Sequence, residues 1–314
     1  MEHKVALVTG ASRGIGRVCA QWLARTGYDV AVTARTVHEG ESREHSSTLK
    51  KSKTNPLPGS LDATAALVEA EGGRALAVAA DLLDPVSLGA CVTTVLDRWE
   101  RIDVVVHNGR YIGPGNMDRF LDTPIELLER QLAANVIGPL VLNKAFLPSM
   151  IERRSGTIMT ITSAVAYTDP LCPAGKGGWG MGYGVSKAAL HRVAGFLEAE
   201  HAHDGIVAVN VQPGMIDTER TLLESGRFGF GGWGAPAEVV GAVVAWLATD
   251  GRACSFRGQT VEAQFLCHEL GLLPHWPGPK PNKSRLRYDR SAENLRRYEE
   301  QLRHDHGLEP EDDR

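Results

Sequence analysis

The sequence predicts a doubly wound α/β domain built on a seven-stranded parallel sheet. Short runs rich in valine, isoleucine and alanine recur along the chain, and segments with helical spacing separate them. The runs are almost continuously apolar, as expected for strands that helices bury on both faces. Alternation of strand and helix with right-handed connections then places the strands parallel to one another in one sheet.

The predicted strands span residues 5–9, 29–34, 75–80, 102–106, 157–162, 207–211 and 259–263. They assign residues 1–265 to a single domain and leave 266–314 as a C-terminal extension. Two insertions interrupt the domain, a polar one at about 37–60 and a glycine-rich one at about 169–182. Both are expected to be loops.

Composition argues against several classes of partner. The chain has a formal net charge of -4, a pI near 6.3 and 43% hydrophobic residues, so nothing favours a nucleic-acid or polyanionic partner. No signal peptide or apolar run of about 20 residues is apparent, which predicts a cytoplasmic protein that does not bind membranes. The five cysteines contain no Cys-x-x-Cys pair and are expected to be reduced, packed thiols.

A glycine-rich turn follows the first strand directly and leads into a helix at 17–25. It reads Thr9-Gly10-Ala11-Ser12-Arg13-Gly14-Ile15-Gly16. Three glycines permit a tight turn and bring a pyrophosphate close to a helix N-terminus, where backbone N–H groups and the helix dipole bind it. A glycine triplet alone is often a plain turn, but the order strand, glycines, helix predicts a dinucleotide site on a Rossmann-type fold.

The spacing Thr-Gly-x-x-x-Gly-x-Gly resembles that of the short-chain dehydrogenase/reductase family. The resemblance implies an oxidoreductase that uses a nicotinamide dinucleotide. The cofactor-binding residues expected from the motifs together are Gly10, Ser12, Arg13, Gly14, Ile15, Gly16, Arg35, Thr36, Asp81, Leu82, Asn108, Gly109, Tyr183, Lys187, Pro213, Gly214, Ile216 and Thr218.

The end of the second strand favours NADP(H) over NAD(H). An NAD enzyme usually has an acid there that accepts hydrogen bonds from the ribose 2′-hydroxyl, whereas this chain has Arg35 followed by Thr36. Arg13 supplies a second guanidinium, and two planar forks suit a 2′-phosphate. The alternative is that Arg13 and Arg35 are solvated surface charges.

Two further strand ends resemble the family in part. Asp81 and Leu82 stand where the family has an aspartate that hydrogen-bonds adenine, although Asp81 could also cap the helix near Pro85, for which Asp84 is better placed. The family's Asn-Asn-Ala-Gly element is replaced by His107-Asn108-Gly109-Arg110, in which only Asn108 matches. Arg110 is not expected to accept backbone dihedrals that suit glycine.

The run Tyr183-Gly184-Val185-Ser186-Lys187 carries the predicted chemistry. A spacing of four on a helix puts the phenol of Tyr183 and the ammonium of Lys187 on one face. A neighbouring ammonium stabilises the phenolate, so Lys187 would make Tyr183 a better acid–base group. Alone, such a pair is usually an ordinary exposed one.

The resemblance completes a catalytic set of four residues. It implies that Ser163, at the end of the fifth strand, hydrogen-bonds the substrate carbonyl, and that Asn135 helps to organise water near Lys187. Lys187 would also hold the nicotinamide ribose. The Pro213-Gly214-Met215-Ile216-Asp217-Thr218 run resembles the family loop that holds the carboxamide, although Pro-Gly is also a simple turn signal.

The predicted function is interconversion of a carbonyl and an alcohol by hydride transfer with NADP(H), with Tyr183 as general acid/base. The alternative from another class is a non-catalytic NADP(H)-binding sensor or scaffold. A metal enzyme is a third possibility, raised by His201-Ala202-His203 and His304-Asp305-His306, but each pair lacks a third ligand at recognisable spacing, so no metal site is predicted.

Other segments bear on substrate and assembly. Trp179 and Met181, together with a substrate loop at about 215–235, are apolar and glycine-hinged, which fits closure over a hydrophobic small-molecule substrate or, equally, core packing. In the C-terminal extension, Leu295, Tyr298 and Leu302 share one face of a short amphipathic helix that would dock on this domain or a neighbour. The family resemblance implies a homodimer or homotetramer. The apolar side chains of the substrate loop are Leu222, Leu223, Phe228, Phe230 and Trp233.

Overall fold

The computed structural model describes residues 3–228 and 234–279. The strands are β1 (Lys4–Thr9), β2 (Tyr28–Ala34), β3 (Ala75–Ala79), β4 (Val104–His107), β5 (Gly156–Ile161), β6 (Ile206–Gln212), β7 (Ile216–Asp217), β8 (Ala235–Pro236) and β9 (Thr260–Glu262). The helices are α1 (Gly14–Arg25), α2 (Leu61–Ala70), α3 (Pro85–Trp99), α4 (Ile125–Leu132), α5 (Gly138–Glu152), α6 (Met181–His201), α7 (Glu219–Glu224), α8 (Glu238–Thr249) and α9 (Ala263–Glu269).

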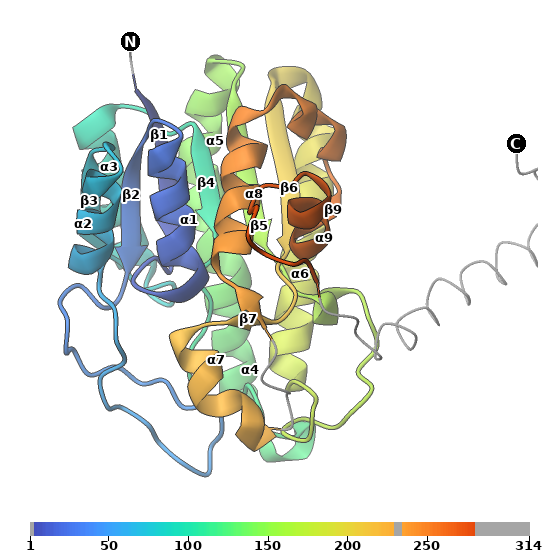
Figure 1. The fold of residues 1–314 in the computed structure, drawn as a ribbon. Coiled ribbons are helices and arrows are strands. Elements are labelled where there is room, and N and C mark those ends of the chain that lie inside the picture. The colour runs from blue at the N-terminus through green and yellow to red at the C-terminus, as the bar shows by residue number, and fades with distance from the viewer. Residues whose placement is uncertain (1–2, 229–233, 280–314) are drawn as a thin grey trace, which may run out of the picture.

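Seven strands form one parallel sheet in the order β3-β2-β1-β4-β5-β6-β9. All seven strands expected from the sequence are present, and their ends differ from the expected ones by no more than two residues. The direction of strand addition reverses between β1 and β4, which lie side by side (Figure 1). In open α/β sheets a crevice for ligands forms at such a reversal, at the carboxyl ends of the strands.

Helices cover both faces of the sheet and bury two apolar clusters. On one face α1 and α8 pack against the sheet through residues such as Leu23 and Val243, and both side chains are fully buried. On the other face α3 and α5 do so through Leu88 and Phe146. Because every central strand is covered twice, its side chains are apolar on both sides, which explains the continuous apolar runs of the sequence.

A second, two-stranded sheet was not expected from the sequence. β7 pairs with β8 in parallel, with Ile216 opposite Ala235. The backbone N–H of Gly234 also donates to the Asp217 carboxylate at 3.0 Å. These contacts hold the two ends of the substrate loop together, so α7 projects beyond the carboxyl edge of the main sheet (Figure 1).

The polar insertion has no helix or strand between β2 and α2, as expected for residues 37–60. It is nevertheless tied to distant segments. The Ser47 carbonyl accepts from the Met117 N–H at 2.9 Å, and the Leu49 N–H donates to the Asp118 carboxylate at 2.9 Å. The insertion therefore runs from β2 to the loop that follows β4.

One helical stretch, Ile125–Glu152, is long and apolar enough to cross a membrane by length and composition alone. It consists of α4, a π-helical turn (Ala133–Ile137) and α5. Phe146 and Leu142 of this stretch are fully buried within the domain, and Asn135 lies in its π-helical turn. It is a core helix of this fold.

Packing of the domain continues beyond residue 265. Leu266 and Cys267 are buried in the first core cluster, and Leu273 and Trp276 pack against it. The amphipathic helix expected around Leu295 lies outside the described residues.

Candidate active site

A large cavity lies at the carboxyl ends of the strands. Its volume is about 2090 Å³. Sites for one small molecule usually enclose roughly 300–1,000 Å³, so this cavity has room for a dinucleotide and a second molecule. The glycine turn after β1, the end of β2 and the loops after β4, β5 and β6 all line it.

The cofactor end of the cavity is built from backbone. Gly10 and Gly14 have φ values of +65° and +56°, which side chains rarely adopt. A Cβ added at Gly16 would collide with the Gly10 carbonyl oxygen, and one added at Gly10 would lie 2.7 Å from the Gly109 Cα. The turn thus leaves an open cradle of N–H groups at the start of α1, which fits a pyrophosphate.

Asn108 fixes this cradle from the side. Its side-chain amide donates to the carbonyl oxygens of Thr9 and Gly10 at 3.0 and 3.1 Å. The Gly109 N–H donates to the Thr9 hydroxyl at 2.9 Å. Asn108 and Gly109 are among the cofactor-binding residues predicted from the sequence, and both line the cavity.

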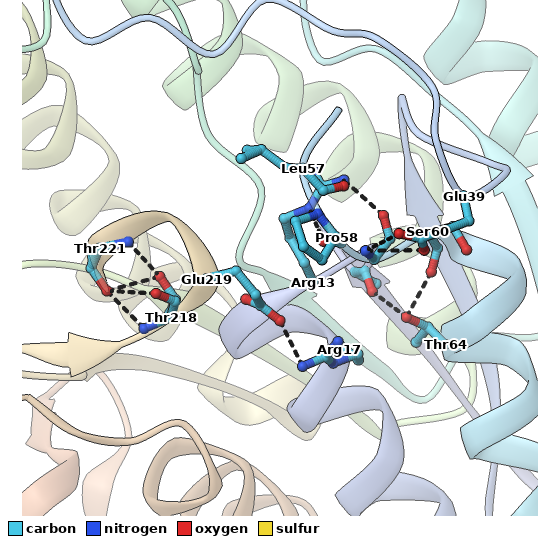
Figure 2. A network of polar contacts seen from close by, with 12 residues as sticks. Arg13, Arg17, Glu39, Leu57, Pro58, Ser60, Thr64, Thr218, Glu219 and Thr221 are labelled. Atoms are coloured by element: carbon cyan, nitrogen blue, oxygen red, sulfur yellow. Dashed lines mark hydrogen bonds and ion pairs between the residues drawn. The ribbon is translucent and has the colours of Figure 1, made fainter. Parts of the chain in front are cut away.

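The two arginines expected to bind a 2′-phosphate both line the cavity, but the insertion already contacts them. Arg13 donates to the carbonyl oxygens of Pro58 at 2.9 Å and Gly59 at 2.7 Å (Figure 2). Arg35 donates to the Glu44 carbonyl at 3.3 Å. These acceptors are uncharged, so they orient the guanidinium groups without neutralising them. No pattern in the sequence predicts that the insertion contacts Arg13.

Other expected cofactor residues gather in the same cavity. Ser12, Ile15, Thr36, Asp81 and Leu82 line it, whereas Gly16 lies just behind the turn. Asp81 accepts from the Leu83 N–H at 3.0 Å.

Asp84, not Asp81, caps the helix that begins at Pro85. Asp84 accepts from the Val86 N–H at 2.9 Å and caps α3. Asp81 is therefore not the cap of α3, and it lines the cavity.

Tyr183 and Lys187 lie in the first turns of α6, as the sequence predicts. The Tyr183 side chain lines the cavity while the residue is only 7% exposed. Lys187 is 3% exposed, and its Nζ donates to the Ile161 carbonyl at the end of β5 at 2.7 Å. Burial, together with the charge of Arg110, lowers the pKa of Lys187 to about 7. Ser163, two residues after β5, lines the same cavity.

Asn135 is fully buried in the π-helical turn and does not line the cavity. Its side-chain oxygen accepts from the Tyr111 N–H at 2.5 Å, and its amide donates to the Ser186 hydroxyl at 2.8 Å. Ser186 in turn donates to the Tyr183 carbonyl at 3.0 Å. Asn135 thus joins the loop after β4 to the first turn of α6. Its contacts with Tyr111 and Ser186 could not be read from the sequence.

The loop after β6 forms the far wall of the cavity. Gly214 has a φ of +73°, and Gln264 donates to the Pro213 and Met215 carbonyls at 3.1 Å each. Thr218 shares a hydrogen bond of 3.0 Å with Thr221 (Figure 2). Pro213, Gly214, Ile216 and Thr218 all line the cavity, as expected.

The cavity wall that follows β6 also contacts α1 and the polar insertion. Arg17 of α1 and Glu219 of α7 form an ion pair of 2.6 Å (Figure 2). Arg220 of α7 donates to the Ser47 hydroxyl of the insertion at 2.9 Å. Neither contact was expected from the sequence.

Arg110 takes up an unexpected position. Its backbone has an ordinary negative φ, because Glu100 and Arg154 are the non-glycine residues with positive φ in the described part of the chain. The loop therefore has a backbone at Arg110 that does not need glycine. The Arg110 guanidinium lies over the Tyr183 ring, 5.3 Å from its centroid. Trp179 of the glycine-rich insertion also contacts that ring, with centroids 4.6 Å apart.

His107 replaces the first asparagine of the family element. It is 1% exposed at the end of β4, and its Nε2 lies 2.7 Å from the Asn143 side-chain oxygen. Burial lowers the pKa of His107 to about 4, so it is neutral at physiological pH. It acts as a packed polar residue behind the cavity.

The remaining described histidine and cysteine residues form no metal-binding cluster. Within residues 3–228 and 234–279, no group of three or more histidine, cysteine or acidic side chains is placed to hold a metal ion. His201 pairs with Asp204 at 2.9 Å, and the pair His304 and His306 lies outside the described residues. All five cysteines are described, and all are free thiols.

Comparison with known proteins agrees with the geometry. The short chain dehydrogenase family model matches residues 4–59 and 54–224. The 3-oxoacyl-[acyl-carrier-protein] reductase of Synechocystis sp. is 31% identical over 262 residues, which are 82% of this chain and 94% of that protein.

Two solved structures show the same fold with a nicotinamide cofactor. One is a 3-oxoacyl-[acyl-carrier protein] reductase from Brucella melitensis in complex with NAD, with a TM-score of 0.67 and 26% identity over 84% of this chain and 96% of that one. The other is a metagenomic short-chain oxidoreductase in complex with NADP, with a TM-score of 0.61 and 26% identity over 82% and 95%. This chain therefore belongs to the short-chain dehydrogenase/reductase family of oxidoreductases.

Proposed function

We propose that this chain is an NADP(H)-dependent oxidoreductase that interconverts a carbonyl and an alcohol, with Tyr183 as the general acid/base. The observation that carries the proposal is the pairing of Tyr183, at the surface of the cavity, with the buried Lys187 one helical turn behind it. Tyr183 lines the same cavity as the glycine turn after β1, which fits a dinucleotide.

In the proposed mechanism, each residue of the catalytic set binds the substrate, moves a proton or positions a neighbour. Ser163 and Tyr183 hold the carbonyl oxygen, and Tyr183 donates a proton to it during reduction. A bound nicotinamide supplies the hydride for reduction and accepts it for oxidation. Lys187, whose pKa of about 7 lets it hold or release a proton near neutrality, replenishes the Tyr183 proton. Asn135 holds the first turn of α6 in place through Ser186.

Tyr183→Phe tests the catalytic assignment. The substitution keeps the ring that packs on Trp179 and removes the hydroxyl, so kcat is expected to fall by about 10²- to 10⁴-fold while cofactor affinity stays near the wild-type value. Turnover is measured by nicotinamide absorbance over a panel of ketones, aldehydes and alcohols. Cofactor affinity is measured by calorimetry.

Tyr167→Phe is the matched control. Tyr167 lines the same cavity, and its hydroxyl donates to Glu262 at 2.6 Å. It should retain most of the activity. Full activity of Tyr183→Phe would assign the proton transfer to another group. A wild-type chain that binds the cofactor and turns over nothing in the panel would instead support the sensor or scaffold function.

Preference for NADP(H) rests on charge at the end of β2. Arg35 directly follows this strand and donates to the Glu44 backbone carbonyl, and Arg13 donates to the carbonyl oxygens of Pro58 and Gly59. We expect kcat/KM with NADPH to exceed that with NADH. Arg35→Asp should reverse the preference, because an acid repels the 2′-phosphate and accepts from a ribose hydroxyl.

Arg43→Asp is the control for charge alone. Arg43 also lines the cavity, but it is exposed and pairs with Glu41 at 2.5 Å. Its substitution should change the NADPH to NADH ratio much less than Arg35→Asp does. Equal efficiency of the wild type with both cofactors would overturn the NADP(H) assignment.

A homodimer or homotetramer remains part of the proposal. Large apolar side chains are exposed on α4, on the π-helical turn and on α6, among them Ile125, Ile137, Val185 and Phe196. Helix faces of this kind suit a symmetric contact between copies.

A further inference from the structure

Exposed apolar side chains gather in the cavity. Isolated apolar residues are common on protein surfaces, whereas a group of them marks a binding site. Among the described residues, seven large apolar or aromatic side chains both line the cavity and have exposed fractions between 36% and 53%. They are Phe120, Tyr167, Leu171, Met181, Val185, Met215 and Phe265.

These seven side chains lie in one half of the cavity. All of them belong to segments that follow β4, β5, β6 or β9, which lie on one side of the reversal between β1 and β4. The glycine turn and Arg35 follow β1 and β2, on the other side. We call the part of the cavity lined by the segments after β4, β5, β6 and β9 the apolar half.

Tyr183 belongs to the apolar half. Met181 and Val185, two residues before and after it on α6, both line the cavity. The Trp179 ring packs on the Tyr183 ring, with centroids 4.6 Å apart. Ser163, which follows β5, lines the same half. A substrate whose carbonyl reaches Tyr183 therefore meets apolar side chains on the way.

Backbone hydrogen bonds hold the apolar half together. The Gly177 N–H of the glycine-rich insertion donates to the Phe228 carbonyl of the substrate loop at 2.7 Å. The Met215 carbonyl accepts from the Ala235 N–H at 2.8 Å and from the Gln264 amide at 3.1 Å. The backbone of Met215 is thus fixed from two sides, while the residue is 36% exposed at the cavity.

The acids of the apolar half have partners in the protein or face water. Glu219 pairs with Arg17 at 2.6 Å, and Glu262 accepts from the Tyr167 hydroxyl at 2.6 Å. Asp169 is exposed to solvent, where a carboxylate contributes little to the binding of a cation. The other acids that line the cavity follow β2 and β3, in the other half, and are Glu41, Glu44 and Asp81.

The cations of the apolar half are likewise engaged or exposed. Arg220 donates to the Ser47 hydroxyl at 2.9 Å. Arg110 donates to the Tyr111 carbonyl at 3.0 Å, and its guanidinium lies over the ring of the catalytic tyrosine. Arg119 is exposed to solvent. A charged substrate would therefore compete with contacts that these side chains already make, or would bind where water screens its charge.

An uncharged hydrocarbon body suits these walls. It needs no partner among the charged groups, and its contact with exposed apolar side chains removes both surfaces from water. Each methylene that leaves water favours binding by up to about fourfold. A charged or hydroxylated body would lose its hydration in the same place without replacing it.

We propose that the substrate is an uncharged ketone or secondary alcohol with a hydrocarbon body, that this body binds the apolar half beside Tyr183, and that Met215 is a specificity-determining residue. This inference rests on the proposed carbonyl–alcohol activity and names its substrate class.

The test measures how kcat/KM changes with the length of a hydrocarbon chain. The probes are 2-butanone, 2-hexanone, 2-octanone and 2-decanone, reduced with saturating NADPH and again with NADH. We expect kcat/KM to rise by about two- to fourfold for each methylene up to 2-octanone. Analogues of 2-octanone that end in a hydroxyl, a carboxylate or an ammonium group should be reduced at least about tenfold less efficiently than 2-octanone itself.

Variants of Met215 test its part in this preference through the ratio of kcat/KM for 2-octanone to kcat/KM for 2-butanone. Met215→Gln keeps the length of the side chain and both backbone contacts, and it should lower the ratio by about 3- to 30-fold because a polar amide replaces the apolar tip. Met215→Leu stays apolar and should keep the ratio within about threefold of the wild type.

Leu121→Gln is the matched control, because Leu121 is 93% exposed and lies outside the cavity lining. It should leave the ratio unchanged. Leu171→Gln, in another segment of the apolar half, replaces Met215→Gln if that variant does not fold. Thermal unfolding and cofactor affinity of each variant show whether it is folded.

The outcomes separate this inference from the proposed function. A wild type that reduces carbonyl compounds without a gain along the ketone series, or that prefers a hydroxyl-, carboxylate- or ammonium-terminated analogue, overturns the substrate class and leaves the oxidoreductase in place. A ratio that Met215→Gln leaves unchanged, or that Leu121→Gln lowers as much, overturns the role of Met215. A wild type that binds the cofactor but turns over no ketone, aldehyde or alcohol overturns the proposed function, and this inference with it.

Discussion

The two ends of the cavity are built in different ways. At the cofactor end, the shape is set by backbone: glycines with positive φ, and carbonyl oxygens held by the Asn108 amide. At the catalytic end, it is set by buried side chains, with Asn135, Ser186 and Lys187 bonded across three segments. The backbone-built end can therefore change little without losing its ligand, whereas single side chains such as Arg110 can alter the end that contains Tyr183.

The largest expected effect that tests this contrast comes from Gly16→Ala. The added methyl group would collide with the Gly10 carbonyl oxygen and lie 2.5 Å from the Asn108 amide nitrogen, and both groups shape the cradle. Backbone cannot move aside as a flexible side chain can. Cofactor affinity should fall on the order of 100-fold, as measured by calorimetry with NADPH.

Gly89→Ala is the matched control for that change. Gly89 also lies in a helix, α3, and a Cβ there meets no atom within 4 Å. Replacing an exposed helical glycine by alanine stabilises a helix by roughly 0.5–1 kcal/mol, so this variant should bind the cofactor normally and unfold at a slightly higher temperature. Normal cofactor binding by Gly16→Ala would show that the cradle tolerates a side chain, and the contrast would fail.

Features that depend on short-range spacing could be predicted from the sequence, whereas contacts between distant residues could not. Strands, the glycine turn, and the pair Tyr183 and Lys187 depend on short-range spacing, and the structure places all of them as expected. The place of the Arg110 side chain could not be read from the sequence, because the motif that this loop resembles has a glycine there and the Tyr183 ring that Arg110 contacts is far along the chain. Partners of Asn135 and Arg13 are far away in the sequence, and spacing carries no information about them.

The buried charge of Lys187 should make the free energy of unfolding depend on pH. Lys187 has a pKa of about 7 in the folded chain, below its ordinary value of 10.5, because it is buried. Between these values the unfolded chain binds one proton more than the folded chain does. The free energy of unfolding therefore rises with pH in this window, with a slope from Lys187 of roughly 1 kcal/mol per pH unit.

Lys187→Met removes that contribution. The variant should gain most over the wild type below pH 7, and the gain should shrink as the pH rises towards 10. Denaturant unfolding at pH 6, 8 and 10 measures it, with Lys144→Met on the exposed side of α5 as the control. Arg110→Gln should raise the pKa of Lys187 in the folded chain, because the Arg110 charge lowers it, and so narrow the window from its lower end. A gain independent of pH would mean that Lys187 keeps its proton in the folded chain across the whole window, so that burial does not lower its pKa.

The smallest expected effect concerns a contact that joins the two ends. Arg220 of α7 donates to the Ser47 hydroxyl at 2.9 Å, and Ser47 accepts from the Met117 N–H at 2.9 Å through its carbonyl. The insertion after β2 thereby links the wall after β6 to the loop after β4, across the cavity. Ser47→Ala removes the hydroxyl acceptor and keeps the carbonyl. The loss of one such hydrogen bond is expected to speed cofactor dissociation by roughly 2- to 10-fold, measured by stopped-flow displacement.

Ser52→Ala is the matched control, because Ser52 lies in the same insertion and its hydroxyl donates to the Glu44 carboxylate at 3.1 Å without reaching α7. Its cofactor dissociation rate should stay near the wild-type value. Equal acceleration by both variants would mean that general loosening of the insertion, and not the contact with Arg220, controls release. Acceleration by Ser47→Ala alone would show that the backbone-built end retains its ligand partly through a side-chain contact between residues some 170 positions apart. Construction from backbone alone would then apply only to the phosphate cradle.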